Sequence, residues 1–315
     1  MSQKRDAIGT VEHVAVALDD LDAARELFGT TLRLPVARCA PAALCALAGT
    51  TTIRIVTPTA EDAALGREGW DHVAIRVASL AECEGRLGTR GIRSTRRVGS
   101  DGRDALWTDP ADTIGIPVQF VEAATDIAFP RPDPNCLIER IDHLGVACRD
   151  AAHARDVYVD TMGYRIESTQ IDSEILVPVQ TTSNDRHGSS SHTGAPISPI
   201  GSGLMALFVT IGEFDLEVMQ PLSQATITTP LGTIPGSVGQ DQGAIARFLE
   251  RRGEGFLHVC FKTLDIDAAL ESVRRAGIGL IDPVARPGAR NSRIAFMDRR
   301  DTQGILMHFV QRIPL

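Results

Sequence analysis

The chain has 315 residues, of which 43% are hydrophobic and 23% charged, as in ordinary soluble globular proteins. A formal net charge of −8 argues against a nucleic-acid groove or an anionic membrane surface as partner. No apolar run approaches the roughly 18 residues that cross a bilayer, and the first residues, MSQKRDAIGT, lack the apolar core of a signal peptide. We therefore expect a cytoplasmic protein, long enough for two domains, without nucleic-acid or membrane partners.

One segment type recurs four times along the chain, each time with a histidine inside a short apolar run. The copies read VEHVAVALDDLDAARELF, WDHVAIRVASLAECEGRL, IDHLGVACRDAAHARDVY and FLHVCFKTLDIDAALESV. In each copy an Asp, Ser or Thr follows the apolar run, and an Ala-rich amphipathic stretch comes next. This pattern predicts one strand that leads into one helix. The repeat makes four residues structurally equivalent: His13, His72, His143 and His258.

Each strand–helix pair is followed by short segments with the composition of strands. In the first copy they are 34–38, 43–48 and 52–57, in the second 92–96, 104–108 and 116–121, and in the fourth 280–285, 293–297 and 305–311. The unit is therefore β-α-β-β-β, and four such units predict an α+β protein.

The boundaries between the units follow from composition. The Pro-rich stretch FPRPDPN separates the first two copies from the last two. We expect an N-terminal domain at 1–128, a linker at 129–138 and a C-terminal domain at 139–315. An insert at 180–203 is rich in Ser, Gly and Pro and is expected to be a loop, either a solvated excursion or a lid over a site. A helix is expected within 239–255.

The six cysteines form no CxxC pair. Cys148 and Cys260 lie in apolar strand segments. We therefore expect buried free thiols and not a disulfide framework.

The repeat resembles the vicinal oxygen chelate superfamily, which includes glyoxalase I, methylmalonyl-CoA epimerase and the extradiol dioxygenases. The stretch ARFLERRGEGFLHVCFKTLDIDAALESVRRAGIGLIDP, followed by RIAFMDRRDTQGILMHFVQ, looks like the second half of methylmalonyl-CoA epimerase. The length, with two domains in tandem, looks more like the extradiol dioxygenases. The resemblance implies that the four units pair into two half-barrel domains, and that such a domain surrounds a divalent metal.

The resemblance also implies which residues hold the metal. Family ligands come from the first strand and from the middle of the last strand of each unit. In the C-terminal domain these positions are His143, Glu217 in FDLEVM, His258 and His308 in ILMHFV. Three imidazoles and one carboxylate suit Fe, Mn, Co, Ni or Zn better than Mg or Ca. The equivalent positions of the N-terminal domain hold Arg54 and Gln119 beside its two histidines, so we expect that domain to bind no metal.

The sequence departs from the family at the last ligand position, where a glutamate is usual and His308 stands instead. In the epimerases that glutamate also acts as an acid/base group. A second epimerase glutamate is replaced by an apolar residue of GLMALFV. We therefore expect Glu217 and His308 to be the catalytic residues. Asn291 and Arg293 precede a strand that faces the expected cavity and either hold an anionic substrate group or are ordinary turn and surface residues.

The function predicted first is a metal-dependent isomerase or epimerase. It would chelate two neighbouring oxygens of a small anionic substrate and stabilise an enolate-like intermediate. An Fe(II)-dependent ring-cleaving or oxo-acid dioxygenase is the alternative favoured by the tandem architecture. A non-catalytic binding protein of the bleomycin-resistance type is the third alternative. Because domains of this superfamily pair within and between chains, a homo-oligomer is compatible with each of these functions.

Overall fold

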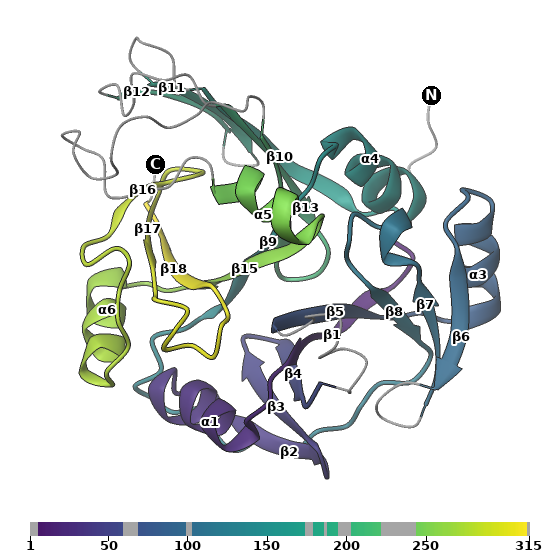
Figure 1. The fold of residues 1–315 in the computed structure, drawn as a ribbon, viewed down its shortest axis with the longest axis horizontal. Coiled ribbons are helices and arrows are strands. Elements are labelled where there is room, and N and C mark those ends of the chain that lie inside the picture. The colour runs from purple at the N-terminus through teal and green to yellow at the C-terminus, as the bar shows by residue number, and fades with distance from the viewer. Residues whose placement is uncertain are drawn as a thin grey trace.

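Two curved sheets form the centre of the molecule, and helices α1, α3, α4 and α6 lie at its periphery (Figure 1). The computed structural model describes residues 6–58, 69–98, 103–173, 179–185, 188–194, 203–221 and 244–313. No described helix is long and apolar enough to cross a membrane.

The first sheet has eight strands in the order β2-β3-β4-β1-β5-β8-β7-β6. At its centre β1 and β5 run antiparallel, and each has a parallel neighbour on its other side, β4 and β8 respectively. The bounds are β1 Thr10–Ala17, β2 Val36–Ala40, β3 Ala43–Ala48, β4 Thr51–Val56, β5 Gly69–Arg76, β6 Ser94–Val98, β7 Asp104–Thr108 and β8 Val118–Val121.

The second sheet repeats this arrangement in the order β12-β11-β10-β13-β14-β9-β15-β18-β17-β16. Here β9 and β15 are the antiparallel centre, with β14 and β18 as parallel neighbours. The bounds are β9 Arg140–Ala147, β10 Arg165–Ser173, β11 Val179–Asp185, β12 Gly188–Gly194, β13 Gly203–Thr210, β14 Asp215–Pro221, β15 Gly255–Lys262, β16 Arg286–Gly288, β17 Ser292–Phe296 and β18 Met307–Arg312. The α+β fold of paired β-α-β-β-β units is confirmed.

Each repeat begins its helix at the same place, with a side-chain oxygen that accepts from backbone N–H groups of the first turn. The capping residues are Asp20, Ser79, Asp150 and Asp265. Such caps satisfy donors that would otherwise lack partners, which explains why the polar residue recurs after every first strand. The helices are α1 Leu21–Arg25 with the π-helix η1 Glu26–Thr31, α3 Leu80–Gly88, the 3-10 helix η2 Pro110–Asp112, α4 Ala151–Arg155 with the π-helix η3 Asp156–Thr161, α5 Ala244–Arg252 and α6 Ile266–Arg275.

The two halves of the chain are in direct contact. The N–H of Ile8 donates to the carbonyl of Met162 at 2.7 Å, and the Tyr158 hydroxyl donates to the carbonyl of Thr113 at 3.2 Å. Buried apolar residues of both sheets belong to one hydrophobic cluster. The position of one half is therefore coupled to that of the other.

Three expectations need correction. The segment 280–285 is not a strand. It makes an isolated bridge from Leu280 to Met297, and a short strand follows at β16. The backbone N–H groups of Ile281 and Asp282 both donate to the carbonyl of Phe296. The carboxylate of Asp282 accepts from the backbone N–H of Phe296 and from the Arg286 guanidinium, so the segment folds around one residue of β17 and does not form a ladder along it.

The expected loop 180–203 contains two strands, β11 and β12, which extend the sheet beyond β10. Strands that add to a sheet edge are held by backbone hydrogen bonds, so an apolar alternation is not needed to form them. The rest of that loop and 239–243 of the helical segment lie outside the described residues, while α5 occupies 244–252.

The expectation of buried free thiols is confirmed for Cys148 and Cys260, and the third correction concerns two other cysteines. Cys39 of β2 and Cys45 of β3 form a disulfide across one hairpin, whereas Cys83, Cys136, Cys148 and Cys260 are free. A hairpin brings residues six apart in sequence to a Cα–Cα distance of 5.9 Å, which a disulfide can bridge.

Candidate metal centre

The middle strands of the second sheet bring the expected ligands onto one face. His143 of β9 pairs with Cys260 of β15, and Cys260 pairs with His308 of β18. In the adjacent row Glu217 of β14 pairs with Gly145, which pairs with His258. Side chains two residues apart on a strand share a face, so both rows project to the same side of the sheet.

The four expected residues lie close together. Nε2 of His143 and Nε2 of His258 each lie 3.2 Å from Oε2 of Glu217. The ring centroid of His308 is 5.2 Å from that of His143 and 4.8 Å from that of His258. All four residues are buried. The structure therefore brings together side chains that lie up to 165 positions apart in the sequence (143 to 308).

Four ring nitrogens of this cluster have no hydrogen-bond partner among the described residues. They are Nε2 of His143, Nε2 of His258, and both Nδ1 and Nε2 of His308. A buried polar atom without a partner costs roughly 1–3 kcal/mol. A divalent transition metal would satisfy these lone pairs, and one ligand atom each from His143, Glu217 and His258 already lies within 4.8 Å of the others. The donor set fits a metal.

The charges of the cluster suit ligation. Burial opposes ionisation of Glu217, but His143 and His258 outweigh it and hold the pKa of its carboxyl well below the usual value. Burial, together with His258 and His143, lowers the pKa of His308 well below its ordinary value. Glu217 is therefore a carboxylate and His308 a neutral imidazole, the forms that bind metals.

A charged network behind the cluster fixes the orientation of His143. Its Nδ1 lies 2.9 Å from Oδ1 of Asp142. Burial opposes ionisation of Asp142, but the pKa of this carboxyl is held well below the usual value by Arg312, His143 and Arg290. Arg290 donates to Asp142 at 3.0 Å and to Asp215 at 2.7 Å. Burial opposes protonation of His143, but Cys260, Glu217 and Asp142 outweigh it and raise the pKa of this imidazole well above its ordinary value. With Nδ1 held by Asp142, Nε2 is the atom directed at the cluster, and it gives up its proton when a metal binds.

Glycine is required beside His258. A Cβ added at Gly145 would lie 2.2–2.5 Å from atoms of the His258 imidazole. The ring thus lies directly over the backbone of β9, and a β-bulge between Phe256 and His258 aligns it with Gly145. The glycine and the bulge together place this ring among the other ligands.

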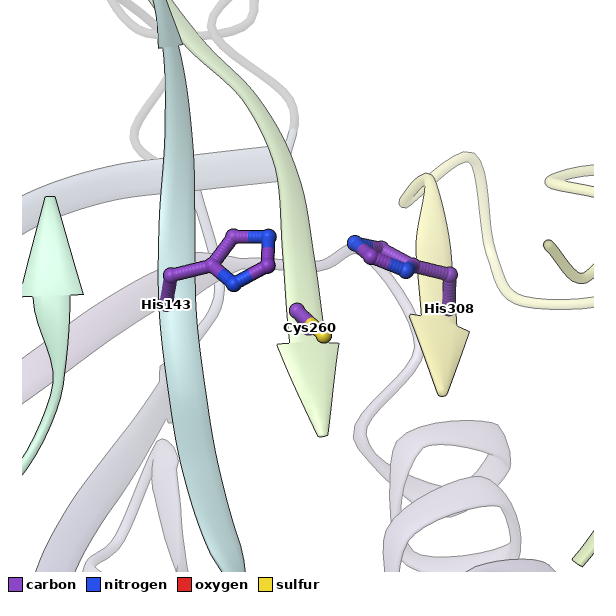
Figure 2. A group of neighbouring side chains, drawn as sticks. All are labelled: His143, Cys260 and His308. Carbon is purple, nitrogen blue, oxygen red and sulfur yellow. The ribbon is translucent and has the colours of Figure 1, made fainter. Parts of the chain in front are cut away.

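Cys260 is the member of the cluster that sequence reasoning missed. Figure 2 shows its side chain on β15 between the rings of His143 and His308, which point toward one another from the flanking strands. One ligand atom from each of these three residues lies within 4.8 Å of the others. Cys260 lies two residues after His258, so strand alternation places it on the same face of β15, but its row with His143 and His308 follows only from the pairing of the strands.

The first sheet has the same positions with different residues. Arg54, Ala15 and His72 occupy one row, and His13, Ala74 and Gln119 the other.

The two histidines of this site face each other, with Nε2 atoms 3.3 Å apart, and Arg54 is 2% exposed. Burial, His72 and Arg54 lower the pKa of His13 well below its ordinary value. A permanent cation thus replaces the carboxylate found in the second sheet. In the described part of the first sheet, no group of three possible ligands gathers.

The two residues expected to bind substrate lie apart from the cluster. Arg293 donates two hydrogen bonds of 2.8 Å to Asp267 of α6, and Asn291 donates to the carbonyl of Ile313 at 3.2 Å. These hydrogen bonds are exposed to solvent. Because both side chains are bonded to other parts of the protein away from the cluster, we do not assign them to the site.

The comparisons with known proteins agree with this geometry. The family described as Glyoxalase/Bleomycin resistance protein/Dioxygenase superfamily matches residues 142–296. The uncharacterised Bacillus subtilis protein YqjC is 24% identical over 174 residues, which are 55% of this chain and 93% of YqjC. The mitochondrial methylmalonyl-CoA epimerase of Bos taurus is 22% identical over 62% of this chain and 87% of the epimerase.

Two solved structures match nearly the whole length of this chain. A mutant of 4-hydroxymandelate synthase from Streptomyces coelicolor has a TM-score of 0.62 at 14% identity, with 97% of this chain and 93% of the synthase covered. The Mn(II)-bound glyoxalase of Novosphingobium aromaticivorans has a TM-score of 0.55 at 10% identity, with 98% and 84% covered. At these identities the likeness concerns the fold alone.

Proposed function

The chain belongs, through residues 142–296, to the Glyoxalase/Bleomycin resistance protein/Dioxygenase superfamily, and from this premise we propose that it is a metal-dependent isomerase or epimerase. The observation that carries the proposal is the buried cluster of three imidazoles and one carboxylate, in which four ring nitrogens lack hydrogen-bond partners among the described residues. His143, Glu217, His258 and His308 hold one divalent metal in this proposal.

A divalent metal held by these residues would supply Lewis-acid chemistry toward two neighbouring oxygens of the substrate. With one carboxylate against a divalent ion, the site would keep a net positive charge, which suits an anionic substrate. Glu217 is the carboxylate within the cluster, and in this proposal it leaves the metal to take a proton from the substrate carbon and return it. His143, His258 and His308 remain as the imidazole ligands.

We also propose that the two halves of the chain are separate domains with different roles. Residues 1–128 form a domain that serves as scaffold, 129–138 a linker, and 139–315 the domain that binds metal. The two sheets, with strands from 10–121 and from 140–312, support this division. The buried Arg54 at the position equivalent to Glu217 supports a first domain without metal.

A dioxygenase is the second candidate, and a specific observation favours it. His143, His258 and Glu217 form a set of two histidines and one carboxylate, the ligand type of non-haem Fe(II) oxygenases. The 2,3-dioxygenase LapB from a Pseudomonas species also matches the fold, with a TM-score of 0.57, 11% identity, and 97% of this chain covered.

The decisive experiment combines metal analysis with two assays on the full chain. The isomerase proposal expects proton exchange at the carbon next to a thioester or oxo group in deuterated water, without oxygen uptake. Oxygen uptake with Fe(II) and a catechol or oxo acid would replace it with the dioxygenase. Tight ligand binding without either reaction would indicate a binding protein, and absence of metal would overturn the metal centre itself.

The variant Glu217→Gln tests the role of the carboxylate. We expect turnover to fall at least about 100-fold, because the group that moves the proton is lost, while the three histidines retain part of the metal. Metal content and exchange rate are measured on the same sample. Near-normal exchange in this variant would show that Glu217 is not the base.

A further inference from the structure

Cys260 lies in the same strand row as two of the expected ligands. It pairs with His143 on one side and with His308 on the other, and it is completely buried. The three side chains come from three adjacent strands and meet on one face of the sheet (Figure 2). The thiol is thus placed between two imidazoles by backbone register.

A second observation points to a ligand at this place. His308 is 2% exposed, and neither of its ring nitrogens has a hydrogen-bond partner among the described residues. Its ring stacks on Phe296 with centroids 4.3 Å apart, which fixes the plane of the imidazole while its polar edge stays unsatisfied. Figure 2 shows the ring directed over Cys260 toward His143.

The first sheet offers a contrast. Its residue at the position of Cys260 is Ala74, which pairs with His13 and Gln119. The thiol of Cys260 therefore occurs in the second sheet, which has all three histidines. In the first sheet, where buried Arg54 stands at the position of Glu217, the methyl group of Ala74 takes the place of the thiol.

We propose that Cys260 is an additional metal ligand, so that the cluster offers two overlapping ligand sets that share His143. The carboxylate set is His143, Glu217 and His258, and the thiolate set is His143, Cys260 and His308. This inference rests on the proposed metal centre and deepens it. Thiolate and imidazole ligands suit Zn²⁺ and Co²⁺, whereas the carboxylate set suits Fe²⁺ and Mn²⁺.

The geometry requires only a small adjustment. Ligand atoms around a tetrahedral Zn²⁺ lie about 3.3–3.8 Å apart, given bond lengths near 2.0 Å to nitrogen and 2.3 Å to sulfur. The atoms of the thiolate set lie within 4.8 Å of one another, so they need to close by at most about 1.5 Å. As the sulfur–metal bond forms, the thiol proton is released to solvent.

The two sets have different consequences for the carboxylate. In the thiolate set Glu217 is not a ligand, and in the carboxylate set it is one of the three ligands. The identity of the bound metal therefore decides whether Glu217 is held by the metal.

The test is a titration of the metal-free full chain with Co²⁺, followed by absorption spectroscopy and by metal analysis of the same sample. Sulfur coordination produces an intense near-ultraviolet charge-transfer band that nitrogen and oxygen ligands do not produce. We expect this band in the wild type and its complete loss in Cys260→Ser. Cys148→Ser, a matched change of a buried free cysteine outside both sets, should keep the band.

The outcomes separate the two proposals. Absence of bound Co²⁺ in the wild type would overturn the metal centre and with it the proposed function. Bound Co²⁺ without a thiolate band would overturn the role of Cys260 and leave the metal centre intact. Because both results come from the wild-type protein, a folding defect in Cys260→Ser does not obscure them, and Glu217→Gln should retain the band as a further check.

Discussion

His308 shows most directly how a single substitution changes this site. It stands in the last strand of the fourth repeat, at the place where the resemblance led us to expect a glutamate, and its imidazole is neutral and buried. Exchanging an anionic ligand for a neutral one makes the metal centre more positive by one unit, which strengthens its attraction for an anionic substrate.

The first prediction concerns this residue. His308→Ala should lower the metal content of the purified chain, because one imidazole is lost from both the expected set and the thiolate set. Metal analysis by mass spectrometry measures the stoichiometry. His153→Ala, which changes a histidine of α4 outside the cluster, is the matched control. An unchanged stoichiometry in His308→Ala would show that this residue is a bystander.

Asp142 carries the second prediction. It accepts from Nδ1–H of His143 and is surrounded by Arg290 and Arg312. Asp142→Asn should weaken metal binding by roughly 10–100-fold, because the ligand loses its orienting carboxylate. Calorimetric titration of the metal-free protein gives the affinity.

The first sheet provides the control for that experiment. Asp71 lies 2.7 Å from Nδ1 of His72 in the same relation. Asp71→Asn should leave the metal affinity unchanged, since that histidine belongs to the sheet with Arg54. Equal losses in the two variants would mean that the carboxylates act through general stability and not through the ligand.

At the scale of elements, β9 leaves room for the present position of the His258 ring of β15 because it has a glycine at that point. Third-repeat Gly145 lies under the His258 ring, and the first repeat has Ala15 at this position, where the site has no expected metal. The strand pair thus combines a ligand on each strand with one position at which a side chain is excluded.

The third prediction follows from this packing. Gly145→Ala should displace the His258 ring, because a Cβ cannot occupy the 2.2 Å gap, and should lower metal content together with the free energy of unfolding by about 1–3 kcal/mol. Gly85→Ala in α3, where a Cβ would meet nothing within 4 Å, should be neutral or stabilising. Denaturant unfolding and metal analysis test both variants. Full metal content in Gly145→Ala would contradict the close contact of Gly145 with the His258 ring.

At the scale of the whole molecule, two sheets of the same design have acquired opposite charges at corresponding positions. Glu217 in the second sheet corresponds to Arg54 in the first, and both are buried beside two histidines. A cation at a ligand position repels a metal ion, whereas a carboxylate attracts it.

The corresponding prediction is one metal per chain. Wild-type protein saturated with metal should bind a single ion, and His13→Ala combined with His72→Ala should not change that number. The reason is that the Arg54 guanidinium stays charged at every accessible pH. Anomalous scattering from crystals of the metal-loaded protein locates the ion. A peak between the histidines of the first sheet would contradict the proposal.

The sequence by itself determined the fold and identified four residues of the cluster. The repeated histidine strand and the polar residue after it predict β-α-β-β-β units, because strand alternation and helix capping act over a few residues. Equivalence between repeats, together with the family resemblance, then singled out His143, Glu217, His258 and His308.

Only the tertiary structure decided the remaining features. The row that joins Cys260 to His143 and His308 depends on strand pairing between distant segments, and a bulge shifts that register in a way no local pattern records. The ion pair of Arg293 with Asp267 likewise depends on how α6 packs against β17. Long-range pairing, and not local composition, decides which buried groups share a site, since each must find its partner across the sheet.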